Sequence, residues 1–450
     1  MAIDYNRAVF AHSLSIPEAA SAEDWAALWN ALPASPGVFS LCCPLDGPHA
    51  GAEPYISKTA NLRRRVQRLL SPDSKSSKRL NLAGRIGSIA YTETGSELET
   101  ALLLYRATRH NFGDRARKRL HLRAPVVLRM AWEKAHPRVY VTHRISTRGR
   151  EHTYGPFSSR QAAERFLDDS LNLFLLRRCT DDLHPDPAFP GCVYSEMKMC
   201  LAPCFKGCTE QRYAAEAEAV RAYFASRGAT LLATLEAERN AASAALDFEA
   251  AAQRHARIQK VQAIAQQAAP LVHPLAQLDA VILQPAGGNL LNKNTAEPAS
   301  HVAVFLVRGG IFSGPELYSA MDMIHPNEHS GSSSLFAHPT ALAPTPLVSE
   351  AAPSRPTRGV LEDRLRQTLQ SLQAQSEENT PDADCIADHL ALLARWYYRP
   401  AAKRTGEIFF RGADGNFPIP KILRGISRVA RGAKNPEEVE SSSTSSSIAG

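Results

Sequence analysis

The strongest constraint on the fold of this chain is a cluster of cysteines. Five of its eight cysteines lie between Cys179 and Cys208, separated by twelve, seven, three and three residues. Prolines and glycines between them supply the tight turns that bring thiolates together. Four converging thiolates suit tetrahedral zinc or an iron–sulfur cluster, and a few buried free cysteines are the alternative. Disulfides are not expected, because we recognise no signal peptide and a reducing compartment is the default.

Composition limits the remaining possibilities. The chain has 450 residues, 44% of them hydrophobic, which is enough for roughly two to four domains with separate cores. No stretch is long and apolar enough to span a membrane, so we expect a cytoplasmic protein with no membrane partner. The formal net charge of +7 favours a polyanion as partner, nucleic acid before membrane. The positive charge is concentrated between residues 62 and 129, whereas the end of the chain is acidic and rich in serine.

The N-terminal part has the pattern of a helix, a hairpin and a second helix. Residues 23–32 predict the first helix, which ends before a proline. The apolar run 36–43 and the segment Tyr55–Ser57 are typical of two short strands. Residues 58–70 then predict a strongly basic helix with leucine and valine on one face and arginine on the rest.

This hairpin and basic helix resemble the GIY-YIG nuclease module of the UvrC family. The matching sequences are Pro-Gly-Val-Phe at 36–39 and Tyr-Ile-Ser-Lys-Thr-Ala-Asn-Leu-Arg-Arg-Arg-Val at 55–66. The resemblance implies that Tyr55 is the base for the attacking water, with Lys58 beside it and Arg65 facing the scissile phosphate. A nearby cation lowers the pKa of a phenol, and a guanidinium stabilises charge on a pentacoordinate phosphate. On one helix, Lys58 and Arg65 would share a face.

Departures from the family pattern predict an impaired nuclease. Phe39 replaces the tyrosine that ends the first motif. The metal-binding glutamate of the family corresponds to Leu104, or to Tyr105 if one residue is inserted, and neither holds Mg²⁺, which prefers carboxylate oxygen. Glu97 and Glu99 are the carboxylates that would have to substitute, and Mg²⁺ or Mn²⁺ is required only if the site is active.

Basic side chains of the same region are expected to hold DNA without catalysis. Arg63, Arg64 and Arg68 lie on the predicted basic helix, and residues 111–130 are also dense in arginine and lysine. Binding to phosphates needs only positive charge, so this function does not depend on the nuclease site.

The segment between the nuclease-like module and the cysteines predicts a small α/β connector. Residues 125–132 and 137–144 are typical of strands, and Ser159–Leu176 of a helix. Between them, Tyr-Gly-Pro-Phe at 154–157 resembles the turn that follows the nuclease module in UvrC.

The cysteine cluster resembles a UvrC segment as well. The matching elements are Leu-Arg-Arg-Cys, Pro-Gly-Cys and Met-Cys-Leu-Ala-Pro-Cys. The resemblance implies that Cys179, Cys192, Cys200 and Cys204 bind a [4Fe-4S] cluster, with zinc as the alternative. Cys208 is additional, either a spare thiol or an alternative ligand.

Residues 213–268 predict a long helical region, expected to form a helical hairpin. Within it, residues 245–258 resemble the UVR motif, which in UvrC docks on a matching hairpin of UvrB. The resemblance implies a UvrB-like partner that contacts Leu246, Phe248 and Ile258. An ordinary amphipathic surface helix is the alternative.

The C-terminal part is less informative. Residues 278–285 and 301–311 are apolar runs typical of buried strands and resemble the segment that follows the UVR motif. Residues 360–375 and 384–398 predict helices. No counterpart of the RNase H-like nuclease or the helix-hairpin-helix module of complete UvrC is recognised after these strands, so the resemblance covers about residues 33–320.

These features predict an α/β multi-domain chain with a small GIY-YIG module, a cysteine-cluster region, a helical hairpin and a partial mixed β segment. The expected units are a degenerate GIY-YIG module (33–110), a basic connector (111–178), the cysteine cluster (179–212), a helical region (213–268) with a UVR-like motif (240–262), a UvrC-like strand segment (275–325), a linker (326–358), an unassigned helical part (359–432) and a disordered tail (433–450).

The favoured function is a UvrC-like protein of nucleotide excision repair and the SOS response. It would bind DNA and a UvrB-like partner with its nuclease site impaired. One alternative is an active GIY-YIG endonuclease that makes a single 3′ incision near a lesion. The other is a metal-cluster scaffold or sensor without a nucleic-acid role, which a DNA-binding salt titration would distinguish.

Overall fold

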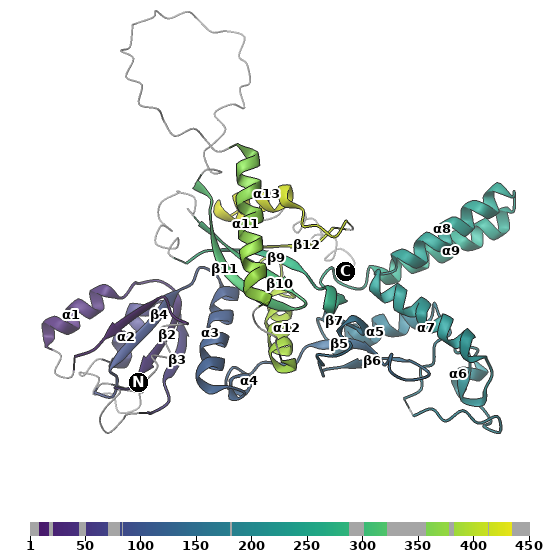
Figure 1. Cartoon of the computed structure of the whole chain (residues 1–450), viewed down its shortest axis with the longest axis horizontal. Coiled ribbons are helices and arrows are strands. Elements are labelled where there is room, and N and C mark those ends of the chain that lie inside the picture. The colour runs from purple at the N-terminus through teal and green to yellow at the C-terminus, as the bar shows by residue number, and fades with distance from the viewer. Residues whose placement is uncertain are drawn as a thin grey trace, which may run out of the picture.

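The computed structural model describes residues 9–17, 21–44, 51–70, 82, 84–180, 182–287, 301–321, 357–377, 382–412 and 414–433. Within these residues it forms helices and three four-stranded antiparallel sheets, which confirms the predicted α/β multi-domain class (Figure 1). The predicted linker and tail lie outside the described residues, except for their outermost positions. Among the described helices, none is both long and apolar enough to cross a membrane.

The N-terminal lobe is a sheet of order β1-β4-β2-β3 with helices on both faces. The sheet contains the predicted hairpin, β2 and β3, together with two strands that were not predicted, β1 and β4. Helix α2 covers the face that holds Phe39 and Leu41, and α3 covers the face that holds Val38. The bounds are β1 His12–Ser15, α1 Ala22–Ala31, β2 Gly37–Cys42, β3 Tyr55–Thr59, α2 Leu62–Leu70, β4 Ser88–Glu93, α3 Glu97–Phe112 and α4 Arg115–Arg119.

The basic helix begins later than the sequence predicted. Lys58 was expected on this helix with Arg65, but it lies in β3, paired with Val38. The chain turns at residues 59–61 because the Thr59 hydroxyl and the Asn61 backbone N–H form a local hydrogen bond of 3.1 Å. The Asn61 side-chain oxygen then accepts from the Arg64 backbone N–H at 2.8 Å, which satisfies one of the free donors at the helix start.

The middle lobe is a sheet of order β6-β5-β7-β8 covered by helices. The strands predicted at 125–132 and 137–144 and the helix after Ser159 are confirmed. Residues 154–157 were predicted as a turn, which is wrong: they belong to β7 and pair with β5 and β8. The bounds are β5 Val126–Met130, β6 Val139–Thr142, β7 Thr153–Phe157, α5 Arg160–Leu171, α6 Val193–Glu196, α7 Glu210–Ala225, α8 Ala229–Ala244, α9 Phe248–Ala265 and β8 His273–Pro274, with 3₁₀ turns at Arg150–His152 and Pro203–Phe205.

The long helical region is divided into three helices rather than a single hairpin. The chain breaks between α7 and α8 at Gly228, whose φ is +88°, and between α8 and α9 at Leu246, whose φ is +61°. Both lie in the left-handed region, which ends a right-handed helix. Helices α8 and α9 form a hairpin that extends away from the lobes (Figure 1).

The C-terminal lobe combines two segments that were predicted as separate units, the strand segment at 275–325 and the helical part at 359–432. Strand β12, from the part expected to be helical, pairs with β9 in a sheet of order β11-β10-β9-β12. Helices α11 and α13 pack on one face and α12 on the other. The predicted helices at 360–375 and 384–398 are confirmed. The bounds are a 3₁₀ turn at Leu275–Gln277, β9 Ala280–Pro285, β10 His301–Arg308, β11 Ile311–Ser319, α11 Arg358–Glu377, α12 Ala383–Tyr397, β12 Glu407–Phe410 and α13 Ile419–Ala430.

The N-terminal and C-terminal lobes meet at α3. Leu98, Leu102 and Tyr105 of α3 are buried in one cluster with residues of α12 and the C-terminal sheet. Just before α3, Gly95 lies against the end of β9, where a Cβ atom would stand 2.2 Å from the Ala286 carbonyl carbon. Glycine is therefore required for this close approach of two backbones.

Candidate functional site

Tyr55 and Arg65, two predicted catalytic residues, are brought together. The Arg65 Nη2 donates a hydrogen bond of 3.2 Å to the Tyr55 hydroxyl, from α2 to the edge strand β3. The Tyr55 ring lies 6.1 Å from the buried Phe39 ring, so phenylalanine supplies packing here but no hydroxyl. The structure thus places the predicted base and the predicted arginine within hydrogen-bond distance of each other.

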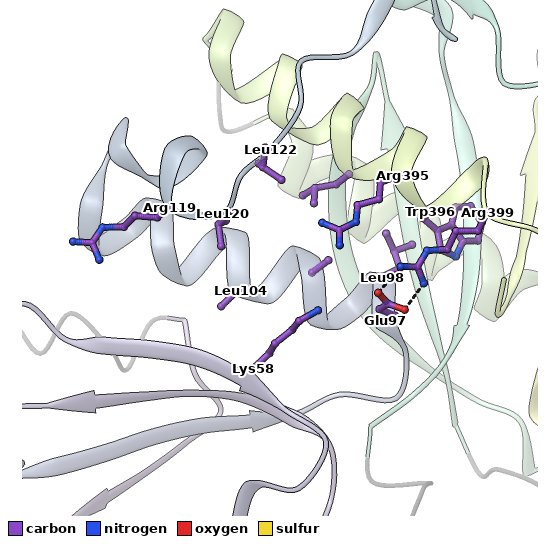
Figure 2. Close-up of a pocket in the computed structure, with 12 residues that line it drawn as sticks. Lys58, Glu97, Leu98, Leu104, Arg119, Leu120, Leu122, Arg395, Trp396 and Arg399 are labelled. Atoms are coloured by element: carbon purple, nitrogen blue, oxygen red, sulfur yellow. Dashed lines mark hydrogen bonds and ion pairs between the residues drawn. The ribbon is translucent and has the colours of Figure 1, made fainter. Parts of the chain in front are cut away.

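Lys58 does not join this pair. Side chains three residues apart on a strand point to opposite faces, and Tyr55 packs toward α2 whereas Lys58 faces α3. The expectation that Lys58 and Arg65 share one face is therefore wrong. Lys58 instead lines a cavity beside Glu97, where its charge helps to lower the pKa of that carboxyl (Figure 2).

The two carboxylates considered as metal ligands are both engaged. Glu97 forms a two-pronged ion pair with Arg399, which enters from the end of α12 and lowers the pKa of the glutamate (Figure 2). Glu99 is buried, and its carboxylate accepts a hydrogen bond of 2.7 Å from the Gly95 N–H. Burial raises the pKa of Glu99 to about 7. Neither group is a free, charged oxygen ligand for Mg²⁺.

The positions that correspond to the family's glutamate hold Leu104 and Tyr105, neither of which has a carboxylate. Leu104 faces the cavity that contains Lys58. Tyr105 is buried against α12, with its ring 5.3 Å from that of His389, and burial raises its pKa. Both side chains therefore serve packing at the junction of the lobes.

The predicted DNA-binding arginines of α2 differ in exposure. Arg64 and Arg68 are exposed. Arg63 is half-buried, and its Nε donates to the Leu32 carbonyl at 2.7 Å, just after α1. Arg63 was expected to bind DNA, but its side chain is used to cap the C-terminal end of α1.

The four predicted cluster cysteines lie within electrostatic reach of one another. Charges on Cys179, Cys192 and Cys204 each raise the pKa of Cys200, after burial as the largest cause. Burial also raises the pKa of Cys208, but no cysteine contributes to that shift. The cysteine charges that act on Cys200 are thus those of the other three predicted ligands.

The backbone of this segment is wound in left-handed turns. Lys198, Ala202 and Lys206 have φ of +54°, +52° and +57° and precede Cys200, Cys204 and Cys208 by two residues each. Non-glycine residues adopt this conformation at a cost of roughly 1–2 kcal/mol each, so the segment is held in an unfavourable shape.

Donors also surround the sulfur atoms. The Arg177 Nη1 donates to the Cys179 Sγ at 3.7 Å, and the Ala202 backbone N–H hydrogen-bonds with Cys200. Hydrogen bonds to sulfur stabilise thiolates and tune iron–sulfur clusters. In the part of the chain that the structure describes, no three His, Cys, Asp or Glu side chains are already at metal-binding positions. The donor set fits a cysteine-ligated centre, and ligation would draw the sulfurs closer together.

The residues expected to bind a partner are divided between surface and core. Leu246 and Phe248 are 72% and 68% exposed at the turn between α8 and α9. Ile258 is only 3% exposed and packs with Val261 and Ile264 in the middle lobe. Ile258 is therefore not a docking residue, because α9 returns to the body of the protein before reaching it.

Two site residues were not found from the sequence. Arg395 and Arg399 come from a segment about 300 residues away from Lys58 and Glu97 along the chain, and local patterns carry no signal for such a meeting. Glu93, at the end of β4, has a buried Oε2 without a hydrogen-bond partner among the described residues. Burial raises the pKa of Tyr91, and the charge of Glu93 adds to this effect. Glu93 lies at the end of the sheet away from Tyr55.

Comparison with known proteins gives one family match. Residues 126–223 match the model of the UvrC/Cho excinuclease middle domain. This range includes β5–β7, α5, the cysteine cluster and most of α7. No solved structure matches the chain.

Curated relatives are UvrABC system C proteins. The protein of Oleidesulfovibrio alaskensis is 29% identical over 262 residues, 58% of this chain and 36% of the relative. That of Edwardsiella ictaluri is 30% identical over 237 residues, 51% of this chain and 36% of the relative. That of Paramagnetospirillum magneticum is 27% identical over 320 residues, 68% of this chain and 47% of the relative. The chain thus spans between a third and a half of the length of these relatives.

The buried Glu99 leads to a pH-dependent prediction. Because its pKa rises from 4.5 to about 7 on folding, the folded chain binds a proton that the unfolded chain releases. This contribution to stability is complete at low pH and is lost as the pH rises through about 7. We expect Glu99→Gln to match the wild type near pH 5 and to be more stable near pH 8, by up to about 3 kcal/mol at roughly 1.4 kcal/mol per pKa unit.

Glu97→Gln is the matched control, two residues away on the same helix. Arg399 lowers the pKa of Glu97, so removal of its charge should destabilise the protein near pH 8. The measurement is the free energy of unfolding from denaturant titrations at both pH values. A loss of stability in Glu99→Gln near pH 8 would contradict a raised pKa of Glu99, because it would mean that the folded protein stabilises the charged form.

Proposed function

We propose that this UvrC-like chain is a cytoplasmic DNA-binding protein of nucleotide excision repair whose nuclease-like site is impaired. The observation that carries the proposal is the state of the carboxylates that could hold a metal ion. A GIY-YIG nuclease needs such a carboxylate, but the family's position for it holds Leu104. Glu97, one possible substitute, is paired with Arg399 from the segment after α12. Glu99, the other candidate, is buried and has a pKa of about 7.

The remaining groups suit binding better than hydrolysis. Arg65 donates to Tyr55 and can contact a phosphate, but without a metal no Lewis acid acts on the leaving oxygen. Arg64 and Arg68 present exposed positive charge on the same helix as Arg65. Contacts of this kind supply most of the affinity of a protein for DNA without reading its sequence.

A second candidate function is an active endonuclease that makes a single 3′ incision. The observation in its favour is the intact hydrogen bond between Arg65 and Tyr55. In such an enzyme Tyr55 would accept a proton from the attacking water, and Arg65 would stabilise the charge that develops on the phosphate. A carboxylate would still have to be released to hold Mg²⁺ or Mn²⁺.

The cysteine segment is proposed to bind a [4Fe-4S] cluster through Cys179, Cys192, Cys200 and Cys204, with zinc as the alternative. Charge effects among these four thiols and hydrogen-bond donors to the sulfur atoms of Cys179 and Cys200 support this ligand set. When bound, such a cluster cross-links four points of a segment with little regular structure. We assign it this stabilising role in the middle lobe.

The tip of the α8–α9 hairpin is proposed to bind a UvrB-like protein. Leu246 and Phe248 are large apolar side chains that are mostly exposed. They lie at the turn between α8 and α9 and at the start of α9, in the hairpin that extends away from the lobes (Figure 1). Exposed apolar anchors on a helical hairpin fit a hydrophobic groove on a partner.

Incision and DNA binding can be separated in one assay. With a lesion-bearing duplex, a UvrB-like protein and Mg²⁺ or Mn²⁺, we expect the wild type to nick no faster than Tyr55→Phe, while it binds the duplex with a steep salt dependence. The Arg64→Ala/Arg68→Ala double variant should reduce the salt slope by about two, because each phosphate contact contributes roughly 0.9. A 3′ nick that is lost in Tyr55→Phe would establish the active nuclease instead. Absence of binding at low salt would favour a metal-cluster scaffold.

The cluster assignment predicts which cysteines matter. After anaerobic purification, the wild type should contain iron and inorganic sulfide, and Cys200→Ala or Cys204→Ala should lose most of both. Cys208→Ala is the matched control and should retain them, because Cys208 is not one of the four proposed ligands. Zinc without sulfide would establish the alternative. An equal loss in Cys208→Ala would contradict the ligand set.

The proposed partner site predicts that variants of exposed residues lose affinity for the partner, whereas a variant of a buried residue loses stability. Leu246→Ala and Phe248→Ala should each weaken binding to a UvrB-like protein by tenfold or more, about 1.4 kcal/mol, with unchanged stability. Leu317→Ala is the control, since Leu317 is 60% exposed on β11 of another lobe. Ile258→Ala should instead lower the free energy of unfolding by about 2–5 kcal/mol. Unchanged affinity in both tip variants would refute the docking site.

A further inference from the structure

A cavity of about 260 Å³ lies where the N-terminal lobe meets α12 (Figure 2). Its lining comes from strand β3, helix α3, the segment after α4, and helix α12 with the residues that follow it. The lining residues that matter here are Lys58, Glu97, Leu104, Leu122, Arg395 and Arg399.

Two cations in the cavity are available to a ligand. Arg399 is neutralised by Glu97, and Arg119 at the far end pairs with Glu53. Lys58 and Arg395 form no ion pair with any residue that the structure describes, and both are exposed at the mouth of the cavity. In Figure 2 their side chains come from opposite sides, Lys58 from β3 and Arg395 from α12. Such a pair of cations is suited to an anion held between them.

The remaining wall of the cavity is apolar. Leu104, Leu120 and Leu122 are half-buried and line it beside Leu98 and Leu392, which are buried. Leucine side chains that stay partly open to solvent gain stability when a flat apolar group covers them. The volume is close to the lower limit of about 300 Å³ for sites that take small organic ligands. An inorganic anion alone would leave most of this wall uncovered.

We propose that the cavity holds one unpaired nucleotide of a DNA strand. Its phosphate lies between Lys58 and Arg395, and its base lies against the leucine wall. A nucleotide combines an anion with a flat and largely apolar ring, which is the chemistry that this lining presents. The proposal rests on the DNA-binding function proposed above and adds a preference for DNA with an unpaired base.

The test compares two fluorescently labelled duplexes of equal length, one fully paired and one with a single unpaired thymidine. We expect the wild type to bind the bulged duplex more tightly, by fluorescence anisotropy at one fixed salt concentration. Arg395→Ala should weaken binding of the bulged duplex roughly tenfold, as expected for one charge-assisted hydrogen bond, and change binding of the paired duplex less than twofold. Arg424→Ala on α13 is the matched control and should change neither.

A third duplex carries an abasic site at the bulge and tests the apolar wall. It should lose most of the preference, because the phosphate is present but the base is not. Equal effects of Arg395→Ala on all three duplexes would overturn the proposal and leave a general charge effect. Binding of the paired duplex without any preference for the bulge would also overturn it, while the proposed DNA-binding function would stand. No binding to any duplex at low salt would refute both.

Discussion

The arrangement of this protein depends on the packing of α3 against α12. Leu98, Leu102 and Tyr105 bury one side of α3 in the C-terminal lobe, and Leu103 and Leu104 pack on the other side against the N-terminal sheet. Charged groups border this contact. The Arg117 Nε lies 3.2 Å from the carboxylate of Asp388, which is fully buried, and Arg109 lies 2.7 Å from Asp382. A buried carboxylate is costly unless it is paired, so Asp388 favours this one arrangement of the two helices.

This contact explains the state of the nuclease-like site. Because α12 lies along α3, Arg399 reaches the first turn of α3 and neutralises Glu97, and Arg395 faces Lys58 across the cavity. The same residues that remove a carboxylate from metal binding therefore create a cationic, partly apolar cavity. In physical terms, the C-terminal segment neutralises the Glu97 carboxylate and adds positive charge to the cavity.

Local patterns predicted what is determined locally. The β2–β3 hairpin, the helix α1 and the strands β5 and β6 follow from local residue patterns. The predictions were wrong where a long-range contact or the exact start of a helix determines the position of a residue. Lys58 was placed on a helix because the boundary at residues 59–61 depends on hydrogen bonds of Thr59 and Asn61.

Two residues that were predicted to bind DNA or a partner protein are instead used in contacts within the protein. Arg63 and Ile258 belong to basic and apolar patterns, but one caps α1 and the other lies in a core. The pairing of β12 with β9 joins residues more than 120 positions apart, and no local pattern carries that information. The four cysteines were identified because spacing and turn residues act over a short range.

The ion pair between Glu97 and Arg399 is not sufficient by itself to account for an impaired site. Both side chains are partly exposed, and exposed pairs contribute only about 0–1 kcal/mol. A divalent cation would compete with Arg399 if the other ligands were in place. Position matters more, because Lys58 and Glu97 face the cavity whereas Tyr55 and Arg65 lie on the opposite face of β3. Loss of the ion pair would therefore free Glu97 but would leave it on the face of β3 opposite Tyr55 and Arg65.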